Sequence, residues 1–381
     1  MKIALLGFDV DGSNMGCQAL VYSFLSLMDE TYESNIEYYV FAYGDCNLDH
    51  IRKRFSRHKF FLVTTSLKKP NSQVKLYNIF NSCDYIFDIT YGDGFSDIYG
   101  KGWNARTDLN KELAAISSST FILLPQTYGP YNSYSLKKWA YHIIKKADYV
   151  FSRDDDSAVE VNKKIGSNKV KAYTDLAFLL PYRKLDFGKK KNIGFNVSST
   201  LWDNVHSASI KLKANYQEYC IKTVKKLLEQ NYIVHLVPHV IDKNNPNAAE
   251  NDCRACDNLA KICKDVIVAP AFNDPIEAKS YISGMDAFIG PRMHATIAAF
   301  SSSVLTIPVA YSKKFEGLYG SLEYNYLVDL RYLSTEDAVI KTLNLLSCED
   351  ELKEAQNWSL KIMSEKIGEF RISIENIIKD M

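Results

Sequence analysis

The chain has 381 residues and carries 46 Lys and Arg against 45 Asp and Glu. At about 150 residues per domain, this length suggests two domains. The balanced charge argues against a basic nucleic-acid binder, and 46% hydrophobic residues exclude a disordered chain. No apolar run approaches the roughly 18 residues of a transmembrane helix, and Asp9 comes too early for a signal-peptide core. We therefore expect a cytoplasmic protein whose contact with a membrane, if any, is peripheral.

Short apolar runs alternate with amphipathic segments through the first half of the chain. Strands are predicted at Lys2–Phe8, Tyr38–Ala42, Phe60–Thr64, Asp84–Ile89, Thr120–Leu124 and Asp148–Ser152. Helices are predicted at Cys17–Met28, Arg106–Ile116, Ser135–Lys146 and Asp155–Ile165. This alternation is typical of a parallel sheet with helices on both faces.

The same alternation restarts after a polar segment, Pro181–Lys191, that we interpret as a linker. Strands are predicted at Asn192–Val197, Ile233–Val237, Val266–Ala269, Ala287–Ile289, Val304–Val309 and Tyr326–Val328. Helices are predicted at Tyr216–Gln230, Ala248–Lys264, Asp274–Ser283, His294–Ser301 and Glu336–Leu346, followed by a long helical stretch, Glu349–Asp380. The sequence thus predicts an α/β protein with two doubly wound, Rossmann-like domains, residues 1–182 and 188–348, facing a cleft. Ligands of such sheets bind beyond the carboxyl ends of the strands.

The most informative motif is Gly290-Pro-Arg292-Met-His294, at the end of a predicted buried strand. Arg292 can form a forked contact with an anion, and a helix that begins here adds free N–H groups. His294 can move a proton near neutral pH. The alternative is that Arg292 pairs with a neighbouring carboxylate and His294 merely caps the helix.

A second Arg at a strand end is Arg153, followed by three acids at the start of a helix. Only 10 of the 46 basic residues are Arg, which makes both positions notable, because Arg suits forked recognition of carboxylate and phosphate. Arg153 could equally pair with Asp155 or Asp156.

Three further loops follow predicted strands and carry polar groups. They are Asn14-Met-Gly16-Cys-Gln18, Gly92-Asp93-Gly94 and Pro125-Gln126. The first is neither a dinucleotide fingerprint nor a Walker A loop. Each could be ordinary turn chemistry, or could hold a sugar.

Histidine, cysteine and asparagine patterns give weaker signals. His239 follows a strand and could face the cleft, while His235 fits a structural role. Cys253, Cys256 and Cys263 lack the second pair of a zinc site, so we expect no metal and reduced cysteines. Asn196 and Asn357 match a glycosylation pattern, but nothing in the sequence suggests secretion.

Taken in order from Met1 to about Leu322, these segments resemble the polysaccharide pyruvyl transferase family. The residues that carry the resemblance are Asn14–Ala19, Gly92-Asp93-Gly94, Pro125-Gln126-x-x-Gly129-Pro130, Ser152-Arg153-Asp154 with Ser157, Thr174-Asp175-x-Ala177-Phe178 and Gly290-x-Arg292-x-His294-Ala. The sequence departs from the family pattern at Asp93, within a usual glycine run, and at Cys17, where an acid is often found.

The resemblance implies a GT-B-like architecture in which the C-terminal helix, residues 350–381, returns to the first domain. It also implies phosphoenolpyruvate as co-substrate, no cofactor, and a sugar acceptor linked to a lipid or a nucleotide in surface polysaccharide biosynthesis. The first domain would then be the acceptor side and the second the donor side. Arg153 and Arg292 would bind the donor and His294 would be catalytic, with Asp93 as a candidate base.

The acceptor contacts expected from the loops are Asn14, Gln18, Gly92, Gln126 and His239. Two other functions stay open on the sequence alone. One is a GT-B-type glycosyltransferase that uses a nucleotide sugar, with Arg292 against the diphosphate. The other is a carbohydrate-binding protein without catalytic activity. The sequence does not indicate an oligomeric state.

Overall fold

The computed structural model describes residues 1–42, 44, 46–64, 70–205 and 210–379. The chain divides by its internal contacts into two compact units. Unit 1 comprises Met1–Asp11, Leu20–Leu176 and Lys366–Met381, and unit 2 comprises Gly12–Ala19 and Ala177–Glu365. The second part of the loop after the first strand, from Gly12, therefore belongs to unit 2, although the strand itself lies in unit 1.

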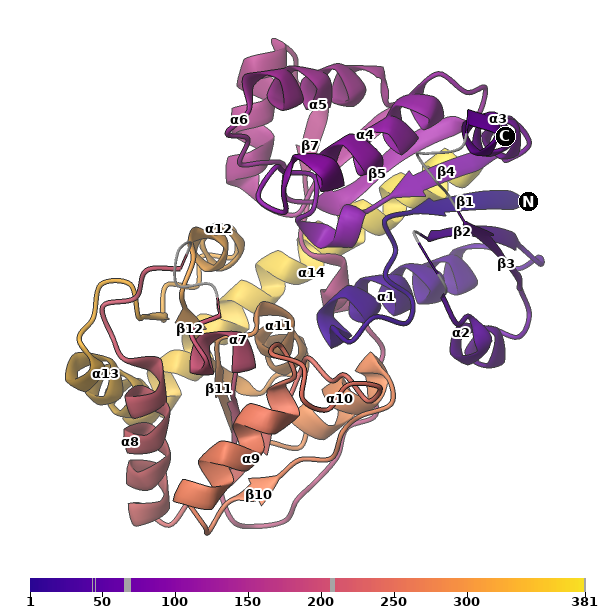
Figure 1. Cartoon of the computed structure of the whole chain (residues 1–381). Coiled ribbons are helices and arrows are strands. Elements are labelled where there is room, and N and C mark those ends of the chain that lie inside the picture. Colours follow the sequence, from indigo (N-terminus) through magenta and orange to yellow (C-terminus); the bar gives the residue numbers. More distant parts are fainter. Residues whose placement is uncertain (43, 45, 65–69, 206–209, 380–381) are drawn as a thin grey trace. The chain divides into compact units, whose positions relative to one another are not determined.

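Unit 1 is built on a seven-stranded parallel sheet in the order β3-β2-β1-β4-β5-β6-β7 (Figure 1). The strands are β1 (Lys2–Leu6), β2 (Glu37–Ala42), β3 (Lys59–Thr64), β4 (Tyr85–Asp88), β5 (Thr120–Gln126), β6 (Tyr149–Ser152) and β7 (Val170–Ala172). The order reverses between β1 and β4, so the loops that leave these two neighbours diverge. This is the switch point where ligands of doubly wound sheets bind.

Helices cover both faces of this sheet because alternate strand residues are apolar on each side. On one face, Ala4, Leu6 and Ile86 pack with Phe80 and Ile143. The helices of unit 1 are α1 (Met15–Thr31), which begins in unit 2, α2 (Asp49–Arg54), α3 (Pro70–Asn81), α4 (Lys101–Ala115), α5 (Tyr134–Lys146) and α6 (Asp155–Ile165), with a short 3₁₀ turn η1 (Thr90–Gly92). A second 3₁₀ turn, η2 (Leu176–Leu179), starts at the last residue of this unit and continues into unit 2.

Unit 2 is built on a six-stranded parallel sheet in the order β10-β9-β8-β11-β12-β13. The strands are β8 (Asn192–Asn196), β9 (Ile233–Val237), β10 (Ile267–Val268), β11 (Ala287–Gly290), β12 (Leu305–Ala310) and β13 (Val328–Asp329). The helices are α7 (Ser199–Trp202), α8 (Tyr216–Glu229), α9 (Asp252–Ile262), α10 (Pro275–Ile282), α11 (Met293–Ser301), α12 (Lys313–Gly320) and α13 (Thr335–Ser347). The switch point of this sheet lies between β8 and β11.

The last helix, α14 (Glu349–Lys379), contributes to both units. In unit 2 the side chain of Gln356 accepts a hydrogen bond from Thr306 N, and in unit 1 Tyr85 donates its hydroxyl to Ile377 O. The predicted end of this helix, Asp380, lies outside the described residues. Two parallel sheets and a long C-terminal helix confirm the predicted fold class.

The sequence analysis missed several short elements and one longer one. The pattern in α2, β7 and α7 spans too few residues to show a period, and α12 is only eight residues long. In α3, Val74 is 60% exposed, which obscures the apolar stripe.

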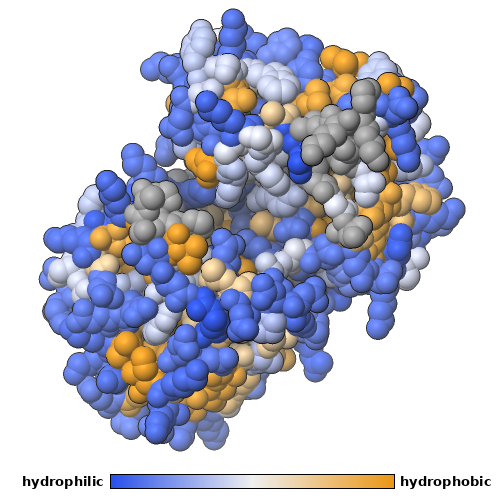
Figure 2. Space-filling model, viewed as in Figure 1, coloured by the Kyte–Doolittle hydropathy of each residue, from blue (hydrophilic) through white to orange (hydrophobic). Residues whose placement is uncertain are grey.

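Figure 2 shows a surface on which hydrophilic residues predominate and hydrophobic residues form small groups. Within the part of the chain that the structure describes, no helix combines the length and hydrophobicity needed to cross a membrane.

Candidate functional site

In unit 2 the switch point is held together by Asn196, the last residue of β8. Its side-chain amide donates to Val237 O at the end of β9, at 2.8 Å, and its Oδ1 accepts from Arg292 N just after β11, at 3.0 Å. Gly290 must lack a side chain here, because a Cβ would lie 2.5 Å from Asn196 Cβ. Asn196 is fully buried, so it is not accessible for glycosylation in the folded chain.

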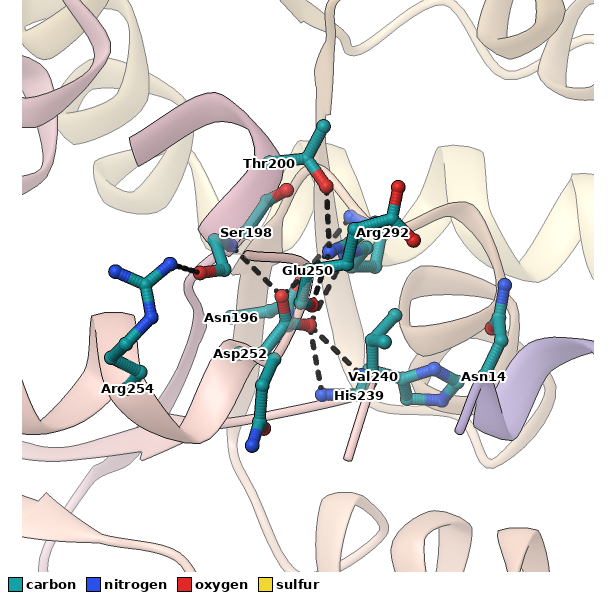
Figure 3. A network of polar contacts seen from close by, with 12 residues as sticks. Asn14, Asn196, Ser198, Thr200, His239, Val240, Glu250, Asp252, Arg254 and Arg292 are labelled. Carbon is teal, nitrogen blue, oxygen red and sulfur yellow. Dashed lines mark hydrogen bonds and ion pairs between the residues drawn. The ribbon is translucent and has the colours of Figure 1, made fainter. Parts of the chain in front are cut away.

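Arg292 forms a forked ion pair with Asp252, the first residue of α9 (Figure 3). Its Nε lies 3.1 Å from Oδ2 and its Nη2 lies 2.6 Å from Oδ1. Burial disfavours the charged guanidinium, but Asp252 more than offsets this and raises the pKa of Arg292 above its usual value. The pairing with a carboxylate that the sequence left open is therefore the one observed, and it fixes the direction of the guanidinium.

Asp252 is the centre of this network and was missed by the sequence analysis. Its side chain is fully buried and also accepts backbone N–H groups from Ser199, His239 and Val240, at 2.9 to 3.1 Å. One carboxylate thus joins the segments after β8, β9 and β11. The only sequence signal was an acid in the first turn of a helix, after the N-cap Asn251, which is too common to single out a residue.

His294 lies in the first turn of α11, whose N-cap position is held by Arg292. Gly16 packs directly on the imidazole, so that a Cβ at this position would collide with His294 Nδ1. The backbone of the loop also pairs with the segment after β9, since Met15 N donates to His239 O at 3.1 Å and Ile241 N donates to Ser13 O at 2.7 Å. The first loop of the chain is therefore part of the histidine site.

His239 lies beside these groups and is buried. Burial, together with the charges of His294 and Arg292, lowers the pKa of His239 to about 3, so its imidazole is neutral at physiological pH. Asn14 accepts a hydrogen bond from Gly16 N at 2.9 Å and forms a β-bridge with Val240. Gln18 is buried and donates its side-chain amide to Gly12 O, so it shapes the loop from within.

In unit 1 the second predicted arginine is also paired. Arg153 donates from Nη1 to Asp175 Oδ2 at 2.9 Å and from Nε to Thr127 Oγ1 at 2.8 Å, and both partners of the ion pair are buried. The sequence suggested Asp155 or Asp156 as partners, but Asp155 pairs with Lys366 and the buried partner is Asp175. Despite burial, the charge of Asp175 raises the pKa of Arg153.

The other residues predicted for unit 1 lie around this arginine. A Cβ at Gly92 would be 3.2 Å from Arg153 Nη1, and the charge of Asp93 acts on the guanidinium. Gln126 is fully buried and donates to the backbone oxygen and to Oδ1 of Asp88, both at 3.2 Å. Gln126 thus supports the loop from below, and its position in this structure does not fit the acceptor contact expected of it.

The structure brings the predicted residues together in two sets, one in each unit. Unit 1 holds Gly92, Asp93, Gln126 and Arg153, and unit 2 holds Asn14, Gln18, His239, Arg292 and His294. The prediction that both sets face one cleft stays a prediction. Among the described residues, no group of three or more His, Cys, Asp and Glu is arranged to hold a metal ion.

Several solved structures are similar to this chain over nearly its whole length. A UDP-N-acetylglucosamine 2-epimerase from Listeria monocytogenes has a TM-score of 0.61 at 10% identity, covering 98% of this chain and 96% of its own. A glycosyltransferase from Rickettsia africae has a TM-score of 0.59 at 13% identity, covering 100% of this chain and 99% of its own. A protein from Anabaena, solved with UDP and glucose, has a TM-score of 0.56 at 10% identity, covering 100% of this chain and 98% of its own. At such identities the likeness shows a shared fold.

A search of curated protein sequences finds no match. The family model described as polysaccharide pyruvyl transferase matches residues 14–313. This span includes the first loop, Arg153, Arg292 and His294, and covers most of the chain. The chain therefore belongs to the polysaccharide pyruvyl transferase family.

Proposed function

We propose that the protein transfers the enolpyruvyl group of phosphoenolpyruvate to a sugar and forms a pyruvate ketal during surface polysaccharide biosynthesis. The observation that carries this proposal is the arrangement in unit 2, where a guanidinium fixed by Asp252 stands at the N-terminus of α11 beside His294. The donor brings a carboxylate and a phosphate. N–H groups at a helix start are suited to bind such anions, and the Asp252 pair leaves the Nη1 side of the guanidinium to approach the donor.

The start of α11, rather than net charge, is the feature of the site that favours an anionic donor. Because Asp252 neutralises Arg292, the ion pair supplies hydrogen-bond donors in a fixed direction without excess positive charge. The helix dipole of α11 then adds positive potential, and His294 lies in the first turn of that helix. His239 beside it is neutral at physiological pH.

The proposed reaction requires an addition and then a substitution at C2 of the donor. One sugar hydroxyl attacks C2 while C3 gains a proton, which turns the methylene into a methyl group. A second hydroxyl of the same sugar then forms the second C2–O bond, and phosphate leaves with its bonding electron pair. His294 either supplies the proton to C3 or protonates the departing phosphate, and Asp93 accepts a hydroxyl proton.

A GT-B-type glycosyltransferase using a nucleotide sugar is the second candidate. It is favoured by one finding, the structural likeness to a protein solved with UDP and glucose. In this case Arg292 would bind the diphosphate, and turnover would release a nucleotide in place of inorganic phosphate.

The two functions are separated by an assay of phosphate release from phosphoenolpyruvate in the presence of lipid-linked and nucleotide-linked sugars. We expect release that needs both the donor and an acceptor, and a ketal methyl signal in the product by NMR. Arg292→Lys should raise the KM for phosphoenolpyruvate about tenfold or more, because a point charge does not replace a fork. Turnover of a nucleotide sugar without phosphoenolpyruvate would support the glycosyltransferase instead.

A further inference from the structure

The loop after β4 in unit 1 has an unusual backbone. Thr90 and Tyr91 both have positive φ, 34° and 58°, and Gly92 follows at 85°. A β-branched residue and a bulky aromatic residue rarely adopt this conformation, and such strain concentrates at ligand sites.

A buried polar network holds this conformation in place. Thr90 donates its hydroxyl to both oxygens of Asp88, at 2.7 and 2.9 Å, while Tyr91 N donates to Gly7 O at 2.8 Å. Asp88 is itself held by Gln126 and lies 4.0 Å from the buried ammonium group of Lys111. The fold therefore fixes the strained loop through several buried polar contacts at once.

The strained loop brings three aromatic rings and one carboxylate together. The ring of Tyr91 lies 5.1 Å from that of Trp103 in α4 with a tilt of 55°, and the ring of Tyr99 lies 6.4 Å from that of Trp103 at 64°, edge to face. The hydroxyl of Tyr99 donates to Asp93 Oδ1 at 2.9 Å. Tyr99 is 54% exposed and the other three are partly exposed, unlike the fully buried aromatic residues of the core.

We infer that Tyr91, Tyr99 and Trp103 form an aromatic platform that binds the ring of the acceptor sugar, a hexopyranose, with its hydroxyl groups toward Asp93. The C–H face of a pyranose is apolar and its hydrogens carry partial positive charge, so it packs on the negative face of an aromatic ring. A partly exposed aromatic cluster with one convergent polar group is the composition expected of a small-ligand site.

The identity of the ligand as an acceptor rests on the proposed function, whereas the sugar-binding site itself does not. The platform adds three binding residues to Asp93. It also explains the strained backbone at Thr90 and Tyr91, which places the ring of Tyr91 in the site. Tyr99 has a second role as a positioning residue, because its hydroxyl orients the carboxylate of Asp93.

Binding can be tested on the full-length protein without any donor. We expect saturation-transfer NMR to detect methyl glycosides of glucose, galactose or mannose on the wild type, with the strongest transfer to C–H protons of one ring face. Trp103→Ala should weaken binding of the glycoside up to about tenfold, as expected for loss of an aromatic contact. Trp358→Ala is the matched control, because Trp358 is an exposed tryptophan of unit 2, and it should leave binding unchanged.

Kinetics then separate this inference from the proposed reaction. Tyr99→Ala, a change at an exposed position that should preserve folding, is expected to raise the acceptor KM and to leave the KM for phosphoenolpyruvate unchanged. Tyr99→Phe should keep binding and lower kcat, since it removes only the hydroxyl that orients Asp93. If Trp103→Ala loses sugar binding and the wild type does not use phosphoenolpyruvate, the platform is supported and the proposed reaction is rejected. The platform is wrong if no hexopyranoside binds the wild type, or if the Trp103 and Tyr99 variants keep the acceptor affinity.

Discussion

The switch points of the two sheets share a topology but differ in the chemistry placed on it. In each unit a glycine allows close approach of two neighbouring segments: Gly7 packs against Thr90 in unit 1, and Gly290 packs against Asn196 in unit 2. The residues that follow then diverge. Unit 1 presents aromatic rings and Asp93, whereas unit 2 presents Arg292 with two imidazoles.

Under the proposed function, this difference matches two different substrates. Groups that donate hydrogen bonds and a helix N-terminus in unit 2 suit an anionic donor, while aromatic rings and a carboxylate in unit 1 suit a neutral sugar. The same fold supports both, because function depends on the side chains at the strand ends and not on the sheet. Under the proposed function, substitutions of Tyr99 or Trp103 should therefore affect the acceptor, and substitutions of Arg292 or Asp252 should affect the donor.

Loss of His294 should have the largest effect. His294→Gln keeps a polar group of similar size but cannot transfer a proton, so kcat should fall about 10²–10⁴-fold. Binding of phosphoenolpyruvate, measured by calorimetry, should change little. A variant that retains wild-type turnover would show that this histidine does not act in proton transfer.

Asp252 tests how much of the donor site depends on one buried carboxylate. Asp252→Asn leaves the Arg292 guanidinium, whose side chain is only 16% exposed, without its counter-charge, and removing one partner of a buried ion pair costs up to about 3–5 kcal/mol. The free energy of unfolding from urea titration should fall by an amount in this range, and the KM for phosphoenolpyruvate should rise. The matched control is Asp203→Asn, which removes an acid from a half-exposed ion pair with Arg254 in the same unit and should have a much smaller effect.

The contrast between Asp252 and Arg292 also shows which site residues could be predicted from the sequence. Arg292 follows a buried apolar strand and opens a helix, so local pattern placed it at a strand end and the site could be expected there. Asp252 lies 40 residues earlier in the chain, and its role depends on three strands meeting at one edge. No local sequence pattern predicts that these three strand ends come together around Asp252.

The same limit applies to the first loop and to Gln126. Strand periodicity predicted both sheets, but the pairing of Asn14 with Val240 joins the loop to unit 2 through a contact between distant segments. Gln126 follows a strand, as a ligand contact would, yet it is turned inward to Asp88. The end of a strand sets the position of a residue's backbone, whereas its neighbours in space decide which way the side chain points.

The two close-approach glycines should respond unequally to substitution. Gly290→Ala forces Asn196 to move, an overpacking that costs about 1–3 kcal/mol. Gly7→Ala should cost more, because Gly7 also has a φ of +68°, which a residue with a Cβ adopts only with strain. Thermal denaturation of both variants would measure this, with Gly320→Ala as control, since a Cβ there meets nothing within 4 Å. Equal losses would mean that backbone strain adds nothing in unit 1.

The pH dependence of stability should reveal the buried imidazole in unit 2. The pKa of His239 is about 3 in the folded chain and about 6.5 when unfolded, so between these values only the unfolded state binds the proton. Stability should therefore fall as pH decreases from 6.5 toward 3, by up to about 1.4 kcal/mol per pH unit. Urea titrations at pH 5, 6 and 7 should show this slope in the wild type and a shallower one in His239→Gln. His142→Gln, a change at an exposed histidine of unit 1, should keep the wild-type slope, and a His239→Gln variant that keeps it too would mean that this imidazole is already protonated in the fold.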